Sequence, residues 1–288
     1  MNRTTDPHPN PLPQTGEGVR WALARASAEL ARTSDTPRLD AELLMAHALG
    51  VSRDALLLGH LDDGVPDGFA PLLARRCAGE PVAYIVGRRA FWTIELEVGP
   101  GVLIPRPDSE TLIEAAVAHF GNGAPARILD LGTGPGTLLL AALDRWPRAS
   151  GLGIDRSETA LGYARRNAER LGVAARAAFR TGDWAAGIAE RFDLVLCNPP
   201  YVAEAAALGP GVREHEPAEA LFAGDDGLAD YRRLADTLPP LIAPGGVACI
   251  ELGAGQAEAV AALFGEAALT ISTRADLNGH ARCLILSR

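Results

Sequence analysis

The stretch Phe192-Asp193-Leu194-Val195-Leu196-Cys197-Asn198-Pro199-Pro200-Tyr201 joins an apolar run to a tetrapeptide with two prolines. The apolar run predicts a buried strand of a parallel sheet, in which Cys197 serves for packing. A proline fixes its own φ near about −65° and keeps the residue before it extended, so Asn198 is held at the strand's carboxyl end. Because proline has no N–H, the two proline carbonyls and the Asn198 amide form an acceptor-rich corner, which Tyr201 can cover. This corner predicts a site for a planar NH2 group.

The same apolar strand is one of several that alternate with helix-like runs. This alternation is typical of a doubly wound α/β sheet. The last two runs are separated only by residues 275–280, which are too few for a crossover helix, so the final strand is expected to be antiparallel. The expected strands are seven, at residues 126–131, 149–155, 175–181, 192–198, 246–252, 269–274 and 281–287.

A glycine-rich loop follows the first of these strands. It reads Asp130-Leu131-Gly132-Thr133-Gly134-Pro135-Gly136 and precedes a helix-like run at residues 137–145. Glycines let the main chain turn beneath a ligand, and the free N–H groups at the start of a helix can bind it. Because Thr137 stands where a dinucleotide fold has its third glycine, NAD is the weaker choice.

Acidic and aromatic residues follow the next two strands. Asp155 ends the second strand, where an acid can accept hydrogen bonds from a ribose diol. Asp183 and Trp184 follow the third, and the Trp184 indole can lie on an adenine face. Parallel strands present their carboxyl ends at one sheet edge, so these residues and Asn198 are expected to converge on one nucleoside-containing ligand.

The amino-terminal part of the chain has a different character. Residues 1–18 are rich in proline and are expected to be a disordered extension. Residues 19–79 have apolar residues at helical spacing and predict a small helical domain of about four helices. The expected helices include residues 39–49 with Gly50 as a cap, 53–60, and 68–78 with Pro66 at its start.

A linker is expected at residues 80–104, ahead of a catalytic domain at residues 105–288. Residues 91–98 alternate apolar and polar side chains, Gly99-Pro100-Gly101 is a turn signal, and residues 102–104 are apolar again. This pattern predicts a β-hairpin whose turn lies at Gly99-Pro100-Gly101.

Composition narrows the class of protein. The 288 residues are 48% hydrophobic and have a formal net charge of −9, which disfavours a broad electrostatic contact with nucleic acid. No apolar run is long enough to span a bilayer and no secretory signal is present, so a cytoplasmic protein is expected. The cysteines are widely spaced, which indicates neither a disulfide framework nor a metal site. They are Cys77, Cys197, Cys249 and Cys283.

Several motifs together resemble the class I S-adenosylmethionine-dependent methyltransferases, and among them the protein-(glutamine-N5) methyltransferases that modify peptide chain release factors. The resemblance covers nearly all of the chain after about residue 20, and the run Leu103-Ile104-Pro105-Arg106-Pro107 is its most specific motif. The other motifs lie at residues 79–87, 108–110, 130–136, 198–201, 216–221, 226–228, 251–253, 256 and 276–282.

The resemblance implies a seven-stranded Rossmann-like fold and methylation of the glutamine of a Gly-Gly-Gln motif. The implied S-adenosylmethionine contacts are Gly132, Thr133, Gly134, Pro135, Gly136, Asp155, Asp183, Trp184 and Asn198. The implied catalytic residues are Asn198, Pro199 and Tyr201, and the implied glutamine contacts are Asn198, Pro199, Pro200 and Tyr201. The helical domain is expected to recognise the release factor.

Other residues have competing interpretations. His215 and Glu216 follow the tetrapeptide, and we assign Glu216 to a substrate lid, against the alternative of a solvated loop charge. Arg106 is expected to hold the linker against the catalytic domain, the alternative being substrate contact. No strong base is needed, because the amide nitrogen becomes acidic after transfer.

Two other functions compete with glutamine methylation. A nucleic-acid methyltransferase acting on adenine N6 or guanine N2 would use the same corner, although the acidic charge disfavours stable nucleic-acid binding. A non-catalytic module that binds the methyl donor is the other alternative, and the intact tetrapeptide disfavours it.

Overall fold

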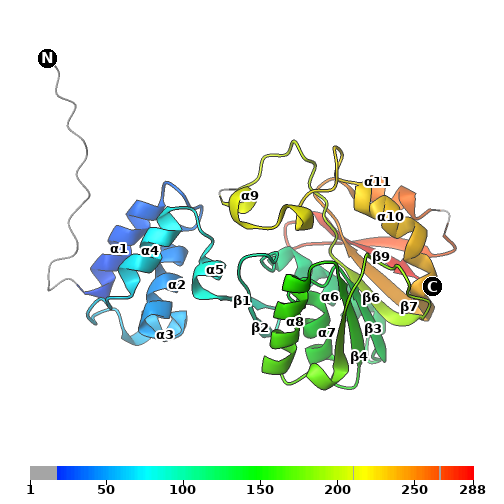
Figure 1. The fold of residues 1–288 in the computed structure, drawn as a ribbon, viewed down its shortest axis with the longest axis horizontal. Coiled ribbons are helices and arrows are strands. Elements are labelled where there is room, and N and C mark those ends of the chain that lie inside the picture. The colour runs from blue at the N-terminus through cyan, green and yellow to red at the C-terminus, as the bar shows by residue number, and fades with distance from the viewer. Residues whose placement is uncertain (1–17, 210, 266) are drawn as a thin grey trace, which may run out of the picture. The chain divides into compact units, whose positions relative to one another are not determined.

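The computed structural model describes residues 18–209, 211–265 and 267–288. The chain divides between Val86 and Gly87 into two compact units (Figure 1). The expected disordered extension lies outside the described residues, except for Gly18, which forms a β-bridge with Gly64. No helix in the described part of the chain is long and apolar enough to cross a membrane.

Residues 18–86 fold around a core that includes Leu23, Leu44 and Met45. Gly50 ends the second helix at a φ of 70°, as its position in the sequence predicted. The helices are α1 Val19–Leu30, α2 Pro37–Leu49, α3 Arg53–Gly59, α4 Phe69–Cys77 and α5 Val82–Val86. Four of these lie within residues 19–79, as predicted, whereas α5 was not predicted and lies in the segment expected to be linker. Helix α4 begins three residues after Pro66 rather than at it.

The second unit begins with a hairpin whose position was predicted wrongly. Its strands are β1 Arg88–Phe91 and β2 Ile94–Glu97, so the turn lies at Trp92 and Thr93. Contacts distant in sequence hold this turn: the Trp92 N–H donates to Glu110 Oε1 over 2.9 Å, and Thr93 Oγ1 donates to Asp144 Oδ2 over 2.6 Å.

The glycines taken for the hairpin turn serve a different purpose. A Cβ on Gly99 would lie 2.3 Å from the Tyr163 hydroxyl, and one on Gly101 would lie 3.0 Å from Thr159 Cγ2. Both neighbours belong to α8 Glu158–Arg170. The glycines therefore let the segment after the hairpin pass close to α8.

The rest of this unit is built on a seven-stranded sheet, as predicted. Its order is β5-β4-β3-β6-β7-β9-β8, and β9 runs antiparallel to both of its neighbours. Both ends of every strand lie within two residues of their predicted positions, except that β7 begins four residues earlier than predicted. The strands are β3 Arg127–Leu131, β4 Ser150–Asp155, β5 Ala177–Thr181, β6 Phe192–Cys197, β7 Ile242–Glu251, β8 Thr270–Ala275 and β9 Ala281–Ser287.

Helices cover both faces of this sheet (Figure 1). On one face α6 Glu110–Phe120, α7 Thr137–Arg145 and α8 pack side by side. On the other lie α10 Ala229–Thr237 and α11 Ala257–Leu263. Tyr231 of α10 and Phe264, directly after α11, belong to a core with alternate residues of the central strands, such as Val195 and Ile250. The parallel strands β3 to β6 therefore bring their carboxyl ends to one edge.

Candidate functional site

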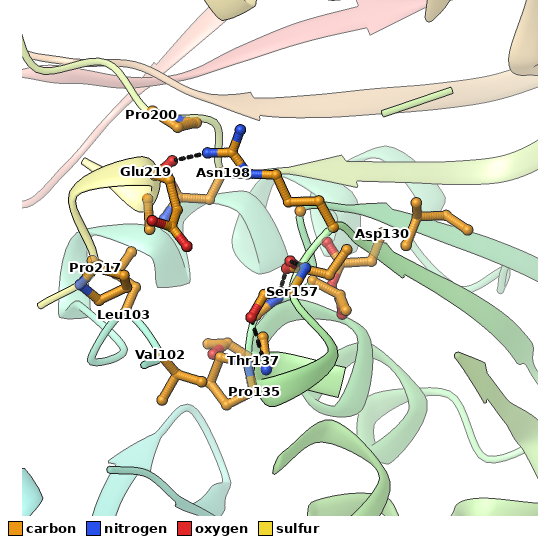
Figure 2. A pocket seen from close by; sticks show the side chains of 18 of the residues that line it. Val102, Leu103, Asp130, Pro135, Thr137, Ser157, Asn198, Pro200, Pro217 and Glu219 are labelled. Atoms are coloured by element: carbon orange, nitrogen blue, oxygen red, sulfur yellow. Dashed lines mark hydrogen bonds between the residues drawn. The ribbon is translucent and has the colours of Figure 1, made fainter. Parts of the chain in front are cut away.

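A cavity of about 1030 Å3, part of it open to solvent, lies at this carboxyl edge. Residues from the loops after β3, β4, β5 and β6 line it, together with the segment after the hairpin and the segment after Glu216. Figure 2 shows Pro135, Ser157, Asn198 and Glu219 around the same hollow. Four strand ends predicted to converge on one ligand thus meet at one cavity.

The glycine-rich loop forms one wall with its main chain. Gly132 has a φ of 71°, and a Cβ on it would lie 3.2 Å from the Trp184 ring. Gly136 caps α7 at a φ of 89° and packs against Leu140, away from the cavity lining. The loop needs glycine at these positions for backbone conformation and for close packing.

Asp130 lies beneath this loop and also lines the cavity. Its side chain is 1% exposed, and Oδ2 accepts hydrogen bonds from the Thr133 hydroxyl over 2.6 Å and the Leu139 N–H over 3.1 Å. No described group donates to Oδ1. Burial raises the pKa of Asp130 to about 7. We did not predict Asp130 as a site residue, although an acid directly before the glycine loop was a usable signal.

Asp155 connects the end of β4 to the loop. Its Oδ2 accepts from the Gly134 N–H over 2.8 Å, and its Oδ1 accepts from the Ser157 N–H over 2.9 Å. Each carboxylate oxygen has a further lone pair, so the cavity-lining Asp155 can also accept from a diol.

Trp184 lies on the cavity wall after β5. It has a φ of 50°, and its Nε1 donates to Asp230 Oδ1 over 3.0 Å, which fixes the plane of the indole. Asp183 also lines the cavity and pairs with Arg233 over 2.5 Å. Asp230 on α10 was not predicted, because nothing in its local sequence marks it as a neighbour of Trp184.

The Asn-Pro-Pro-Tyr corner contributes Asn198 and Pro200 to the cavity lining, whereas Pro199 and Tyr201 are not among the lining residues. Asn198 Nδ2 donates to Ser109 Oγ over 3.2 Å. The Tyr201 hydroxyl donates to Glu251 Oε1 over 3.3 Å, and burial raises the pKa of Tyr201 well above its usual value.

Glu216 has a buried side chain and does not line the cavity. Its Oε2 accepts from the Ile104 N–H over 3.0 Å, and its Oε1 accepts from the guanidinium of Arg106. Arg106 therefore connects the segment after the hairpin to the 217–220 segment on the cavity rim. His215 is not among the cavity-lining residues.

The cavity lining agrees with the requirements of a nucleoside-containing methyl donor. The glycine-rich turn admits close approach of a ligand, Asp155 offers acceptors, and the Trp184 indole offers a flat apolar surface.

Models of two known domains match the chain. The model described as "PrmC N-terminal domain" matches residues 22–87, and the model described as "Methyltransferase domain" matches residues 123–251. Among solved structures, a methyltransferase from Pyrococcus furiosus is similar in fold, with a TM-score of 0.52, 17% identity and coverage of 76% of this chain and 98% of that one. The fold, the glycine-rich loop and these matches define an S-adenosylmethionine-dependent methyltransferase.

Curated relatives identify the family. The "Release factor glutamine methyltransferase" of Rhodospirillum rubrum is 46% identical over 93% of this chain and 82% of its own length. Those of Cereibacter sphaeroides and Caulobacter vibrioides are 44% and 42% identical, covering 93% and 87% of this chain and 96% and 89% of their own lengths. The chain belongs to the release factor glutamine methyltransferase family.

Proposed function

We propose that this protein transfers a methyl group from S-adenosylmethionine to the side-chain amide nitrogen, N5, of the glutamine in the Gly-Gly-Gln motif of peptide chain release factors. The observation that carries the proposal is Asn198 on the wall of the cavity that the glycine-rich loop also lines. Its Nδ2 donates a hydrogen bond to Ser109 Oγ, and no described group donates to its Oδ1. Family membership supports the same substrate.

The proposed donor contacts lie at the ends of β3, β4 and β5. The main chain from Gly132 to Pro135 would hold the donor, Asp155 would accept hydrogen bonds from its ribose hydroxyls, and Trp184 would offer its adenine a flat apolar surface. When bound, S-adenosylmethionine supplies an electrophilic methyl on a sulfonium sulfur, so that the N–C bond forms as the S–C bond breaks.

The substrate amide is a weak nucleophile because its lone pair is delocalised into the carbonyl. Asn198 Oδ1 and the Pro199 carbonyl accept its two hydrogens and aim the nitrogen into the cavity. As positive charge develops on nitrogen, these fixed acceptors stabilise it more than the neutral ground state. The nitrogen then loses one proton. Tyr201 packs behind this corner and Glu216 holds the cavity rim in place.

The helical unit has the proposed role of reading the release factor beyond the single glutamine, which cannot by itself identify its protein. A cytoplasmic location follows from such a substrate.

Labelled donor distinguishes this function from nucleic-acid methylation. The purified chain is incubated with labelled S-adenosylmethionine and a release factor, the same factor with its motif glutamine changed to alanine, or ribosomal RNA. We expect label only in the unchanged factor, at the glutamine side chain by mass spectrometry. Label confined to RNA, or equal label in both factors, would refute the proposal.

A further inference from the structure

Gln256 lies directly before α11, at the N-cap position of this helix, yet its side chain accepts from no N–H of the described helix. Serine, threonine, aspartate and asparagine are preferred at an N-cap because their short side chains accept from the first free N–H groups. The longer side chain of Gln256 instead bonds to main-chain groups outside the helix. The helix thus forgoes a side-chain cap, which indicates that Gln256 serves another purpose.

Three main-chain groups determine how the Gln256 side-chain amide is oriented. Its Nε2 donates to the Tyr201 carbonyl oxygen over 3.1 Å and to the Gly227 carbonyl oxygen over 3.4 Å. Its Oε1 accepts from the Gly253 N–H over 3.1 Å. Main-chain groups cannot exchange the roles of donor and acceptor, so these partners fit a glutamine amide in one orientation only.

Two glycines let these segments come together. A Cβ on Gly227 would lie 2.3 Å from the Tyr201 carbonyl oxygen and 2.9 Å from Gln256 Nε2. A Cβ on Gly253 would lie 2.3 Å from Gln256 Oε1 and 3.0 Å from Tyr201 Cδ2. The motifs at residues 226–228, 251–253 and 256 therefore meet around Tyr201, the last residue of the Asn-Pro-Pro-Tyr corner.

Tyr201 depends on these contacts more than the rest of the corner does. Each proline of the corner keeps the residue before it extended, so the first half of the corner is rigid by itself. No proline follows Tyr201, and hydrogen bonds hold its main chain instead. The peptide group between Tyr201 and Val202 accepts from Gln256 through its oxygen and donates to the Leu221 carbonyl over 2.9 Å through its N–H.

We propose that Gln256 is a positioning residue for methyl transfer, which fixes the main chain of Tyr201 and thereby the Tyr201 ring in the corner that holds the substrate amide. The inference rests on the proposed role of Tyr201 in this corner. Because the Tyr201 hydroxyl donates to Glu251 Oε1 over 3.3 Å, the residue is held at both ends, by Gln256 at its carbonyl and by Glu251 at its hydroxyl. A small displacement of a group that orients the substrate is costly for the rate of transfer.

Two substitutions disturb the Tyr201 carbonyl to different degrees. Gln256→Met has a side chain of similar length with no hydrogen to donate, so this carbonyl loses its partner. Gln256→Glu places a charged acceptor against the carbonyls of Tyr201 and Gly227 and repels them. Neither Gln256 nor Tyr201 is among the described residues that line the cavity, so neither substitution should alter donor binding.

Single-turnover transfer to a release factor tests the proposal, with KM for the release factor and donor Kd by calorimetry. We expect the rate to fall by about fivefold in Gln256→Met and about thirtyfold in Gln256→Glu, with KM and donor Kd within about twofold of wild type. In a Tyr201→Ala background, Gln256→Glu should lower the rate by less than about twofold further, because Gln256 acts through Tyr201. A general loss of structure would instead add to the effect of Tyr201→Ala.

Gly227→Ala tests the same carbonyl without changing Gln256. Its Cβ would press on the Tyr201 carbonyl oxygen, and the rate should fall by about tenfold with donor Kd unchanged. Gly245→Ala is the matched control, because Gly245 has a similar φ of 75° but no described atom within 4 Å of an added Cβ. Its rate should equal that of wild type.

A wild-type rate in folded Gln256→Glu, equal losses in the two glycine variants, or additive losses with Tyr201→Ala would overturn the proposal. Donor Kd that rises in step with the loss of rate would do the same. Thermal unfolding identifies any variant that fails to fold, and Gln256→Met with the glycine pair then decides. If Asn198→Ala is inactive while Gln256→Glu is fully active, only the positioning role fails, whereas a wild-type protein that leaves the glutamine unlabelled refutes the proposed function itself.

Discussion

The two sides of the cavity are built by different means. At the ends of β3, β4 and β5 the main chain forms much of the wall, and Asp155 accepts from two of its N–H groups. At the ends of β6 and β7 side chains form the site, through the hydrogen bonds from Asn198 to Ser109 and from Tyr201 to Glu251.

This difference predicts that substitutions on the two sides of the cavity act in different ways. On the proposed donor side an added carbon atom is damaging, because the main chain must come close to its ligand. On the proposed glutamine side the direction of hydrogen bonds matters more than volume. A buried acid supports each side, Asp130 below the glycine loop and Glu251 behind the corner, and burial raises both pKa values to about 7.

The largest effect on the donor side is expected from Gly132→Ala. Gly132 has a φ of 71° and its added Cβ would press on the Trp184 ring, so donor Kd should rise by about a hundredfold. Gly172→Ala is the matched control, since Gly172 has a φ of 70° but open space around it. Calorimetry should find normal donor binding there with a similar loss of stability, and equal binding losses would contradict the account.

Trp184→Ala should weaken donor binding by about tenfold, through loss of the adenine contact. Trp184→Phe should recover part of the affinity. Asp230→Asn keeps an oxygen that can accept from Trp184 Nε1 and should bind within about twofold of wild type. Fluorescence titration measures all three, and unchanged affinity in Trp184→Ala would remove Trp184 from the proposed donor site.

The buried acids predict how stability depends on pH. The folded pKa values of Asp130 and Glu251 lie above their unfolded values, so each group favours folding at low pH and loses this contribution as the pH rises through about 7. The free energy of unfolding should fall between about pH 5 and 7 by roughly 1 kcal/mol per pH unit for each group. Urea unfolding of Asp130→Asn should show a shallower fall, and an unchanged slope would contradict the assignment.

The smallest effect is expected at the cavity rim. Glu216→Gln can still accept from the Ile104 N–H but loses its charge beside Arg106, so KM for the release factor should rise by about threefold with kcat nearly constant. Glu214→Gln, the same change on the neighbouring short helix, should leave KM unchanged. A fall in kcat without a change in KM would place Glu216 in the chemical step instead.

The seven-stranded sheet could be predicted because buried parallel strands are continuous apolar runs, and loops of recognisable composition follow them. The hairpin was misplaced because a pair of glycines can indicate either a turn or a place where two segments pack closely. The sequence does not reveal that Gly99 and Gly101 pack against Tyr163 and Thr159. The turn at Trp92 depends on Glu110, which lies 18 residues away.

The candidate site was predictable where one segment carries both the motif and its proposed ligand contact. Residues 132–135 of the glycine loop, Asp155, Trp184 and Asn198 were predicted in this way and line one cavity. Ser109 and Asp230 were not, because each acts on a partner brought close only by folding, Asn198 and Trp184 respectively.

Asn198→Ala, measured for both donor binding and methyl transfer, tests the division of the cavity most directly. The variant removes the proposed glutamine acceptor and leaves the loop from Gly132 to Pro135 and Trp184 in place. We predict that calorimetry finds donor Kd within about twofold of wild type while single-turnover transfer to the release factor falls by at least about a hundredfold. Retained transfer, or loss of donor binding in step with transfer, would contradict the account.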